Sequence, residues 1–127
     1  MLLAMVLVTS NQPQQVLSLR YVERVLPADL DGVREDLKAL VGELTPGFRL
    51  FVDLSLLEYM DPECLTEMGR TMELLDQRGV GLIVRVIPDP AKDIGLSILT
   101  IFHYPHNPRV ITCQSVIEGL RQLALWR

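Results

Sequence analysis

Two apolar stretches separated by a polar patch open the chain. Residues 1–8 are almost entirely apolar, residues 10–15 have the composition of a turn, and residues 16–22 again contain strand-forming side chains. This pattern predicts a β-hairpin. The opening stretch has no basic residues ahead of its apolar part and no Ala-x-Ala site after it, so we interpret it as a strand and not as a signal peptide.

A helix is predicted over residues 29–44. Its apolar positions recur at spacings of three and four, which places them on one face of a helix. These positions are Leu30, Val33, Leu37, Leu40, Val41 and Leu44. The sequence Thr45-Pro46-Gly47 then ends the helix, because Pro disfavours helical geometry in the residue before it and Gly tolerates the reversal of the chain.

Two nearly continuous apolar runs, residues 48–54 and 81–87, are typical of strands that helices cover on both faces of a sheet. A second helix is predicted between them, with Asp61 as its N-cap, Pro62 in its first position and Gly79 at its end. Its apolar stripe consists of Leu65, Met68, Met72 and Leu75.

The remaining part of the chain continues the alternation. A third helix is predicted over residues 94–102, followed by a loop at 104–108, a short strand at 110–112 and a last helix. The last helix is expected to turn Val116, Leu120 and Leu123 toward the core.

The predicted order of elements is β-β-α-β-α-β-α-β-α. Such alternation predicts an α/β sandwich with a mostly parallel or mixed central sheet and flanking helices, and the first two strands form one antiparallel edge. A length of 127 residues with 49% hydrophobic side chains supports a single domain, residues 1–127, with its own packed core.

Charge and hydropathy exclude several function classes. The net charge of −4 supplies no electrostatic footprint for a nucleic-acid backbone. No apolar run approaches the roughly 18 to 20 residues that a membrane-spanning helix requires. We therefore expect a cytoplasmic protein that binds no nucleic acid.

Residues with catalytic or metal-binding chemistry are few. Cys64 and Cys113 lie in different predicted elements and match no zinc spacing, and acidic residues near Cys64 oppose a thiolate. His103 and His106 have a ligand-like spacing, but Pro105 breaks a helical register between them and no third ligand is near. We expect inert thiols, a loop histidine pair, no metal, no cofactor and no catalytic residue, and the enzyme hypothesis is the weakest one.

Acidic residues gather around the turn between the central strand and the second helix. They are Glu58, Asp61, Glu63 and Glu67. Capping and interaction with the helix dipole explain Asp61 and Glu63 adequately and Glu58 less well. The alternative is that the four acids together form an exposed recognition site for a basic partner. Asp53 is expected at the carboxyl end of the central strand, where α/β sheets present residues to ligands or loops.

The stretch Leu-Phe-Val-Asp-Leu-Ser-Leu-Leu-Glu-Tyr-Met-Asp, residues 50–61, resembles the STAS domain family of bacterial anti-sigma factor antagonists. The family has a strand ending in Asp-Leu-Ser, an apolar run up to an Asp, and then the turn Asp-Ser-Ser-Gly-Leu, whose Leu corresponds to Leu65. Residues 116–120 resemble the family's final helix, so the resemblance extends from about Val16 to Leu123. It implies the STAS fold over the whole chain.

One departure from the family concerns its phosphorylation switch. In the family a Ser or Thr that accepts a phosphate follows the Asp, whereas here Pro62 directly follows Asp61 and Glu63 comes next. Asp61 thus keeps its place while the phosphoacceptor role has no hydroxyl. The permanent charge of Glu63 has two interpretations: it complements the helix dipole, or it holds the protein in a state resembling the phosphorylated one.

The resemblance implies a non-catalytic regulatory module that cannot be switched at the usual position. Its partner would be a protein, such as an anti-sigma factor or a kinase-like regulator, and homodimer formation stays open. The predicted partner-binding residues are Glu58, Asp61, Pro62, Glu63, Cys64 and Leu65. The alternative is a STAS-like ligand- or lipid-binding subunit that reaches a membrane only through its association with a transporter.

Overall fold

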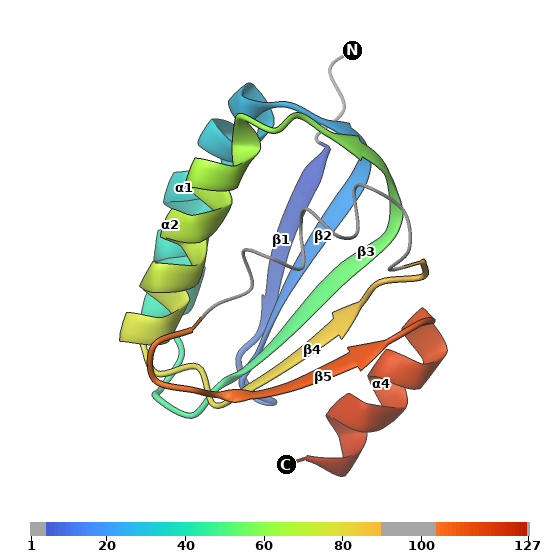
Figure 1. Cartoon of the computed structure of the whole chain (residues 1–127). Coiled ribbons are helices and arrows are strands. Elements are labelled where there is room, and N and C mark those ends of the chain that lie inside the picture. The colour runs from blue at the N-terminus through green and yellow to red at the C-terminus, as the bar shows by residue number, and fades with distance from the viewer. Residues whose placement is uncertain (1–4, 90–103, 127) are drawn as a thin grey trace.

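Five strands form one mixed sheet in the order β1-β2-β3-β4-β5 (Figure 1). The structure, a computed structural model, describes residues 5–89 and 104–126. The strands are β1 (Val6–Asn11), β2 (Val16–Val25), β3 (Arg49–Met60), β4 (Leu82–Val86) and β5 (Arg109–Cys113). β1 pairs with β2 in antiparallel orientation, and all other neighbouring strands are parallel. The predicted hairpin and the mostly parallel sheet are confirmed.

Helices lie on both faces of this sheet. α1 (Pro27–Gly42) and α2 (Cys64–Gln77) lie side by side on one face, and α4 (Val116–Leu125) lies on the other face against β3, β4 and β5 (Figure 1). The helix predicted over residues 94–102 falls outside the described residues.

The two faces carry two separate apolar clusters. The larger cluster lies under α1 and α2 and includes Leu17, Leu19, Leu50 and Val52 from the middle strands. The smaller cluster lies under α4 and consists of buried Val16, Phe51, Leu82, Val84, Val86 and Cys113. Because β3 and β4 contribute to both clusters, their sequences are apolar on both sides, as the continuous apolar runs predicted.

The reversals after α1 and α2 contact each other through glycines. Gly47 and Gly79 have φ angles of +93° and +87°, a conformation that favours glycine. The backbone N–H of Gly47 donates to the carbonyl of Gly79 at 2.7 Å. A β-carbon on Gly79 would lie 3.0 Å from that of Pro46, so this contact also requires a residue without a side chain.

Three predicted details of β3 and α4 are wrong. β3 does not end near residue 54 but continues to Met60, because its second half pairs with β2 as far as Val25. Asp53 is therefore not at the end of β3, although it is the last residue of β3 that pairs with β4. Leu120 does not turn into the core: its side chain is 51% exposed, whereas Val116 and Leu123 pack on the smaller cluster as expected.

Candidate functional site

The turn between β3 and α2 is held together by backbone hydrogen bonds around Asp61. The N–H of Asp61 donates to the carbonyl of Val25 at 3.0 Å, and the carbonyl of Asp61 accepts from the N–H of Cys64 at 2.8 Å. These bonds anchor the turn to the end of β2. They fix the start of α2 relative to the sheet.

Asp61 is not the N-cap of α2 that the sequence predicted. The helix begins at Cys64 with Glu63 as its N-cap, and no side chain caps it. The Oδ1 of Asp61 instead accepts from the N–H of Glu63 at 2.9 Å, two residues on, which is the geometry of an Asx turn. Pro62 and Glu63 form this turn ahead of the helix, so Asp61 organises the turn rather than the helix itself.

The six residues predicted to bind a partner differ in exposure. Glu58, Pro62 and Glu63 are exposed, and Asp61 and Leu65 are half-buried. Cys64 is fully buried, so its side chain faces the core and presents nothing to a partner. The surface at this turn therefore consists of the other five residues.

Burial also explains why the thiol of Cys64 is chemically quiet. Its Sγ lies 3.6 Å from the carbonyl of Val25, to which it donates. Burial, followed by the negative charges of Asp61 and Asp29, raises the pKa of Cys64 to about 11. The thiolate is therefore scarce at neutral pH, in agreement with the predicted inert cysteine.

The acidic cluster seen in the sequence divides in two. Glu67 faces α1, where its carboxylate pairs with Arg34 of that helix and with Arg70 of its own helix. The hydrogen bond from Arg34 lowers the pKa of Glu67. Glu67 thus links α1 to α2, whereas Glu58 and Glu63 are exposed at the turn and Asp61 is half-buried.

Exposed apolar side chains lie beside these acids, and the sequence analysis did not single them out. They are Leu26 at 46%, Leu56 at 54% and Tyr59 at 36% exposure. The guanidinium of Arg24 lies 5.0 Å from the ring centre of Tyr59, its cross-strand neighbour. We call Leu26, Leu56, Tyr59, Glu58, Asp61, Pro62, Glu63 and Leu65 the turn surface.

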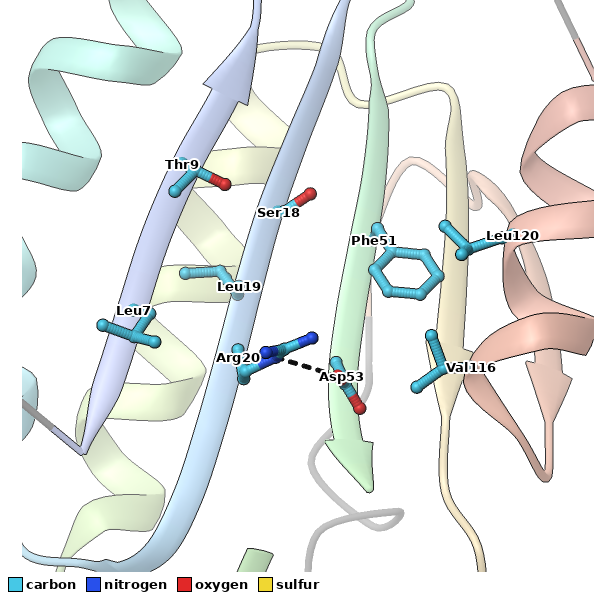
Figure 2. A pocket seen from close by; sticks show the side chains of 9 residues that line it. All are labelled: Leu7, Thr9, Ser18, Leu19, Arg20, Phe51, Asp53, Val116 and Leu120. Carbon is cyan, nitrogen blue, oxygen red and sulfur yellow. Dashed lines mark hydrogen bonds and ion pairs between the residues drawn. The ribbon is translucent and has the colours of Figure 1, made fainter. Parts of the chain in front are cut away.

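A hollow of about 360 Å³ lies on the face of the sheet that carries α4, between α4 and strands β1 and β2. Figure 2 shows the side chains that line it. They are Leu7, Thr9, Ser18, Leu19, Arg20, Phe51, Asp53, Val116 and Leu120. The hollow exists because α4 covers only the β3–β5 half of this face.

Asp53 is buried beside the hollow with a cation as its partner. Its side chain is 2% exposed, and its Oδ2 accepts from the Nε of Arg20 at 3.0 Å (Figure 2). Its Oδ1 accepts from the backbone N–H of Ser55 at 2.9 Å. The Arg20 side chain is 47% exposed, so the carboxylate is withdrawn while the cation is presented to solvent.

Of the predicted loop pair His103 and His106, only His106 lies within the described residues. The backbone N–H of His106 donates to Oδ1 of Asp76 at 3.1 Å, and its Nδ1 lies 2.5 Å from Oδ2. Asp76 is 6% exposed and therefore ties the chain ahead of β5 to the end of α2. Among the described residues, no three His, Cys, Asp or Glu side chains are grouped to hold a metal ion.

The helices in residues 5–89 and 104–126 include no candidate for a membrane span. None of the helices there has both the length and the apolar character needed to cross a bilayer.

No family model and no curated protein sequence matches the chain. Several solved structures match the chain. The anti-sigma factor antagonist SpoIIAA in its unphosphorylated form matches with a TM-score of 0.60 at 14% identity, over 94% of this chain and 97% of that one. An anti-sigma factor antagonist from Mycobacterium paratuberculosis matches with a TM-score of 0.58 at 18% identity, over 94% and 92% of the two chains.

A third structure points the same way. An uncharacterised protein of the DUF3478 family from Shewanella loihica PV-4, described as having a SpoIIAA-like fold, matches with a TM-score of 0.66 at 14% identity. The match covers 93% of this chain and 91% of that one. The chain therefore has the SpoIIAA-like fold, and the predicted α/β fold is confirmed.

Proposed function

We propose that this protein is a non-catalytic regulatory module that binds a partner protein through the turn surface. The observation that carries the proposal is the combination, around one strand-to-helix turn, of exposed apolar side chains with two exposed acids, Glu58 and Glu63, and the half-buried Asp61. Leu56 and Tyr59 would supply the apolar contact, and Glu58, Asp61 and Glu63 would select a basic partner. Two of the structures with this fold are named as anti-sigma factor antagonists, which supports an anti-sigma factor or kinase-like regulator as the partner class.

Regulation at this turn would not use a phosphate at the usual position. Pro62 and Glu63 carry no hydroxyl, and the nearest hydroxyls are those of Ser55, Tyr59 and Thr66. Glu63 is exposed and negatively charged next to the first turn of α2. In this proposal partner choice is constitutive, because the charge that a phosphate would add is replaced in part by a permanent carboxylate.

The binding experiment compares substitutions on and off the turn surface. Isothermal titration calorimetry measures the affinity for the anti-sigma factors and kinase-like regulators of the source organism. Leu56→Arg should weaken the complex at least about tenfold, which is about 1.4 kcal/mol. Leu125→Arg is the matched control, because Leu125 is also exposed, at 73%, but lies at the end of α4.

The absence of switching has its own test. Wild type and Pro62→Ser are incubated with a serine kinase of the switch type, and incorporated phosphate is located by mass spectrometry. Only Pro62→Ser should be modified. Phosphate on Ser55, Tyr59 or Thr66 of the wild type, together with a change in partner affinity, would refute constitutive partner choice.

A second candidate function is supported by the hollow beside Arg20. Its volume of about 360 Å³ lies within the range of small-molecule sites, roughly 300 to 1,000 Å³. This supports the ligand-binding part of the alternative, in which a STAS-like subunit binds a small molecule or lipid and associates with a transporter.

A further inference from the structure

We propose that the hollow between α4 and the β1–β2 face binds a small amphipathic monocarboxylate, with its carboxylate on Arg20 and its apolar body against Phe51 and Leu120. The proposal deepens the ligand-binding alternative by naming a ligand class. It does not depend on partner binding at the turn surface, because the two sites share no residue.

The register of the sheet places the residues of the hollow in two rows across three strands. One row runs Thr9, Ser18 and Phe51, and the next runs Leu7, Arg20 and Asp53. Side chains of both rows lie on the face that carries α4 (Figure 2). Apart from Asp53, the polar side chains of the hollow therefore lie on β1 and β2, whereas Phe51 lies on β3, next to α4.

Arg20 is held in place by the buried carboxylate beneath it. Only its Nε is engaged, by Oδ2 of Asp53, and among the described residues its two terminal amino groups have no hydrogen-bond partner. These groups present a donor pair that matches the two oxygens of a carboxylate. The hydroxyls of Thr9 and Ser18 lie in the neighbouring row and provide further donors.

The charge of the site favours one negative charge on the ligand. Arg20 is already paired with Asp53, so the two side chains together are neutral. A monoanion leaves one negative charge without a balancing cation but gains charge-assisted hydrogen bonds from the exposed side of the guanidinium, whereas a dianion such as a phosphate monoester would leave two.

The opposite wall of the hollow is apolar. Phe51 forms its base, and Val116 and Leu120 of α4 form its side (Figure 2). Leu120 and Leu7 are 51% and 45% exposed, so a ligand would cover apolar surface that the described part of the chain leaves open to water. An apolar body extending from the carboxylate toward α4 would cover Leu120, whereas Leu7 lies on β1, on the other side of Arg20.

The test uses octanoate as the probe and 1-octanol as its neutral counterpart. Titration of the ¹⁵N-labelled protein, followed through its amide resonances, should shift Thr9, Ser18 and Arg20 on addition of octanoate. The affinity for octanol should be at least about tenfold lower than that for octanoate, because octanol lacks the charge-assisted bond to Arg20.

Two variants avoid the ion pair, so that folding is not at risk. Leu120→Trp fills the hollow and should abolish octanoate binding, and Thr9→Val removes one hydroxyl and should weaken it. Leu125→Trp places the same ring outside the hollow and should bind like wild type.

Three results would overturn the proposal: no shift of the three amides, equal affinity for octanol and octanoate, or unchanged binding by Leu120→Trp. A fourth would do the same. If these amides shift with protein concentration alone, a second copy of the chain covers the hollow and no ligand site exists there.

Discussion

At the scale of single residues, the ion pair between Arg20 and Asp53 is the most consequential contact. A carboxylate that is 2% exposed is tolerated because it accepts one bond from Arg20 and one from the Ser55 N–H. Arg20→Met should destabilise the protein by about 1–3 kcal/mol in urea unfolding, because Asp53 then loses the one cation that pairs with it in residues 5–89 and 104–126. The Arg20→Met/Asp53→Asn double variant should recover part of this loss, since it buries no unpaired charge.

An unchanged unfolding midpoint for Arg20→Met would contradict this account of Asp53. Asp53 was singled out from the sequence because a carboxylate stands among apolar residues, but its partner was not. Arg20 and Asp53 are cross-strand neighbours only in the parallel register of β2 and β3. Hydrophobic alternation within a strand fixes the face on which a side chain lies, but a slip by two residues keeps that face, so the alternation does not identify the residue opposite on the next strand.

Cys64 gives a second prediction at this scale. Its thiol has a pKa raised to about 11 by burial, so we expect it to resist modification by iodoacetamide at pH 8 in the folded protein. Burial also raises the pKa of Cys113, and both thiols should react once the protein is unfolded. Rapid labelling of Cys64 in the native protein would show that the start of α2 opens.

The same pKa shift gives the sign of a pH effect on stability. The folded state holds the proton of Cys64 more tightly than the unfolded state, whose thiol titrates near 9.0. The stabilising contribution is therefore complete below pH 9 and is lost as the pH rises toward 11. A Cys64→Ala variant should lose less of its own stability across this interval.

At the scale of elements, two helical glycines should respond to the same substitution in opposite directions. A β-carbon on Gly119 would lie 2.9 Å from both Phe51 and Val86, so Gly119→Ala should displace α4 and lower the free energy of unfolding. A β-carbon on Gly69 meets nothing within 4 Å, so Gly69→Ala should stabilise α2 by about 0.5–1 kcal/mol. Chemical denaturation of both variants measures the difference, and stabilisation by Gly119→Ala would mean that α4 does not pack closely on β3 and β4.

The elements that the sequence predicts correctly differ from the part that it misses in their contact with the core. Helices and strands packed on the core were found because their apolar periodicity is local to the sequence. The second half of β3 was missed because it pairs only with β2, so residues such as Leu56 and Glu58 face solvent and interrupt the apolar run. Overhanging strands of this kind depend on a neighbour that the sequence pattern does not identify.

Asp76 shows the same limit for a helix. It follows the buried Met72 by four residues, so the periodicity places an acid on the apolar stripe of α2. A carboxylate buried at that position indicates that it has a hydrogen-bond partner. The partner is His106, which lies thirty residues further along the chain.

At the scale of the whole molecule, unequal coverage of the sheet explains why two candidate sites exist. α1 and α2 cover one face, whereas α4 covers only part of the other (Figure 1). The part that α4 leaves uncovered contains the hollow beside β1 and β2. The turn surface arises separately, where β3 extends beyond its pairing with β4. The two proposed sites share no residue, so we expect substitutions at one site to leave binding at the other unchanged.

The central claim, that the turn surface binds a regulatory partner, is tested most directly by the affinity of Leu56→Arg beside that of Leu125→Arg. Calorimetric titration with the anti-sigma factors and kinase-like regulators of the source organism should give a complex that Leu56→Arg weakens at least about tenfold. Leu125→Arg should bind as wild type does. Binding to none of these proteins, or a complex that both variants form equally well, would contradict the account.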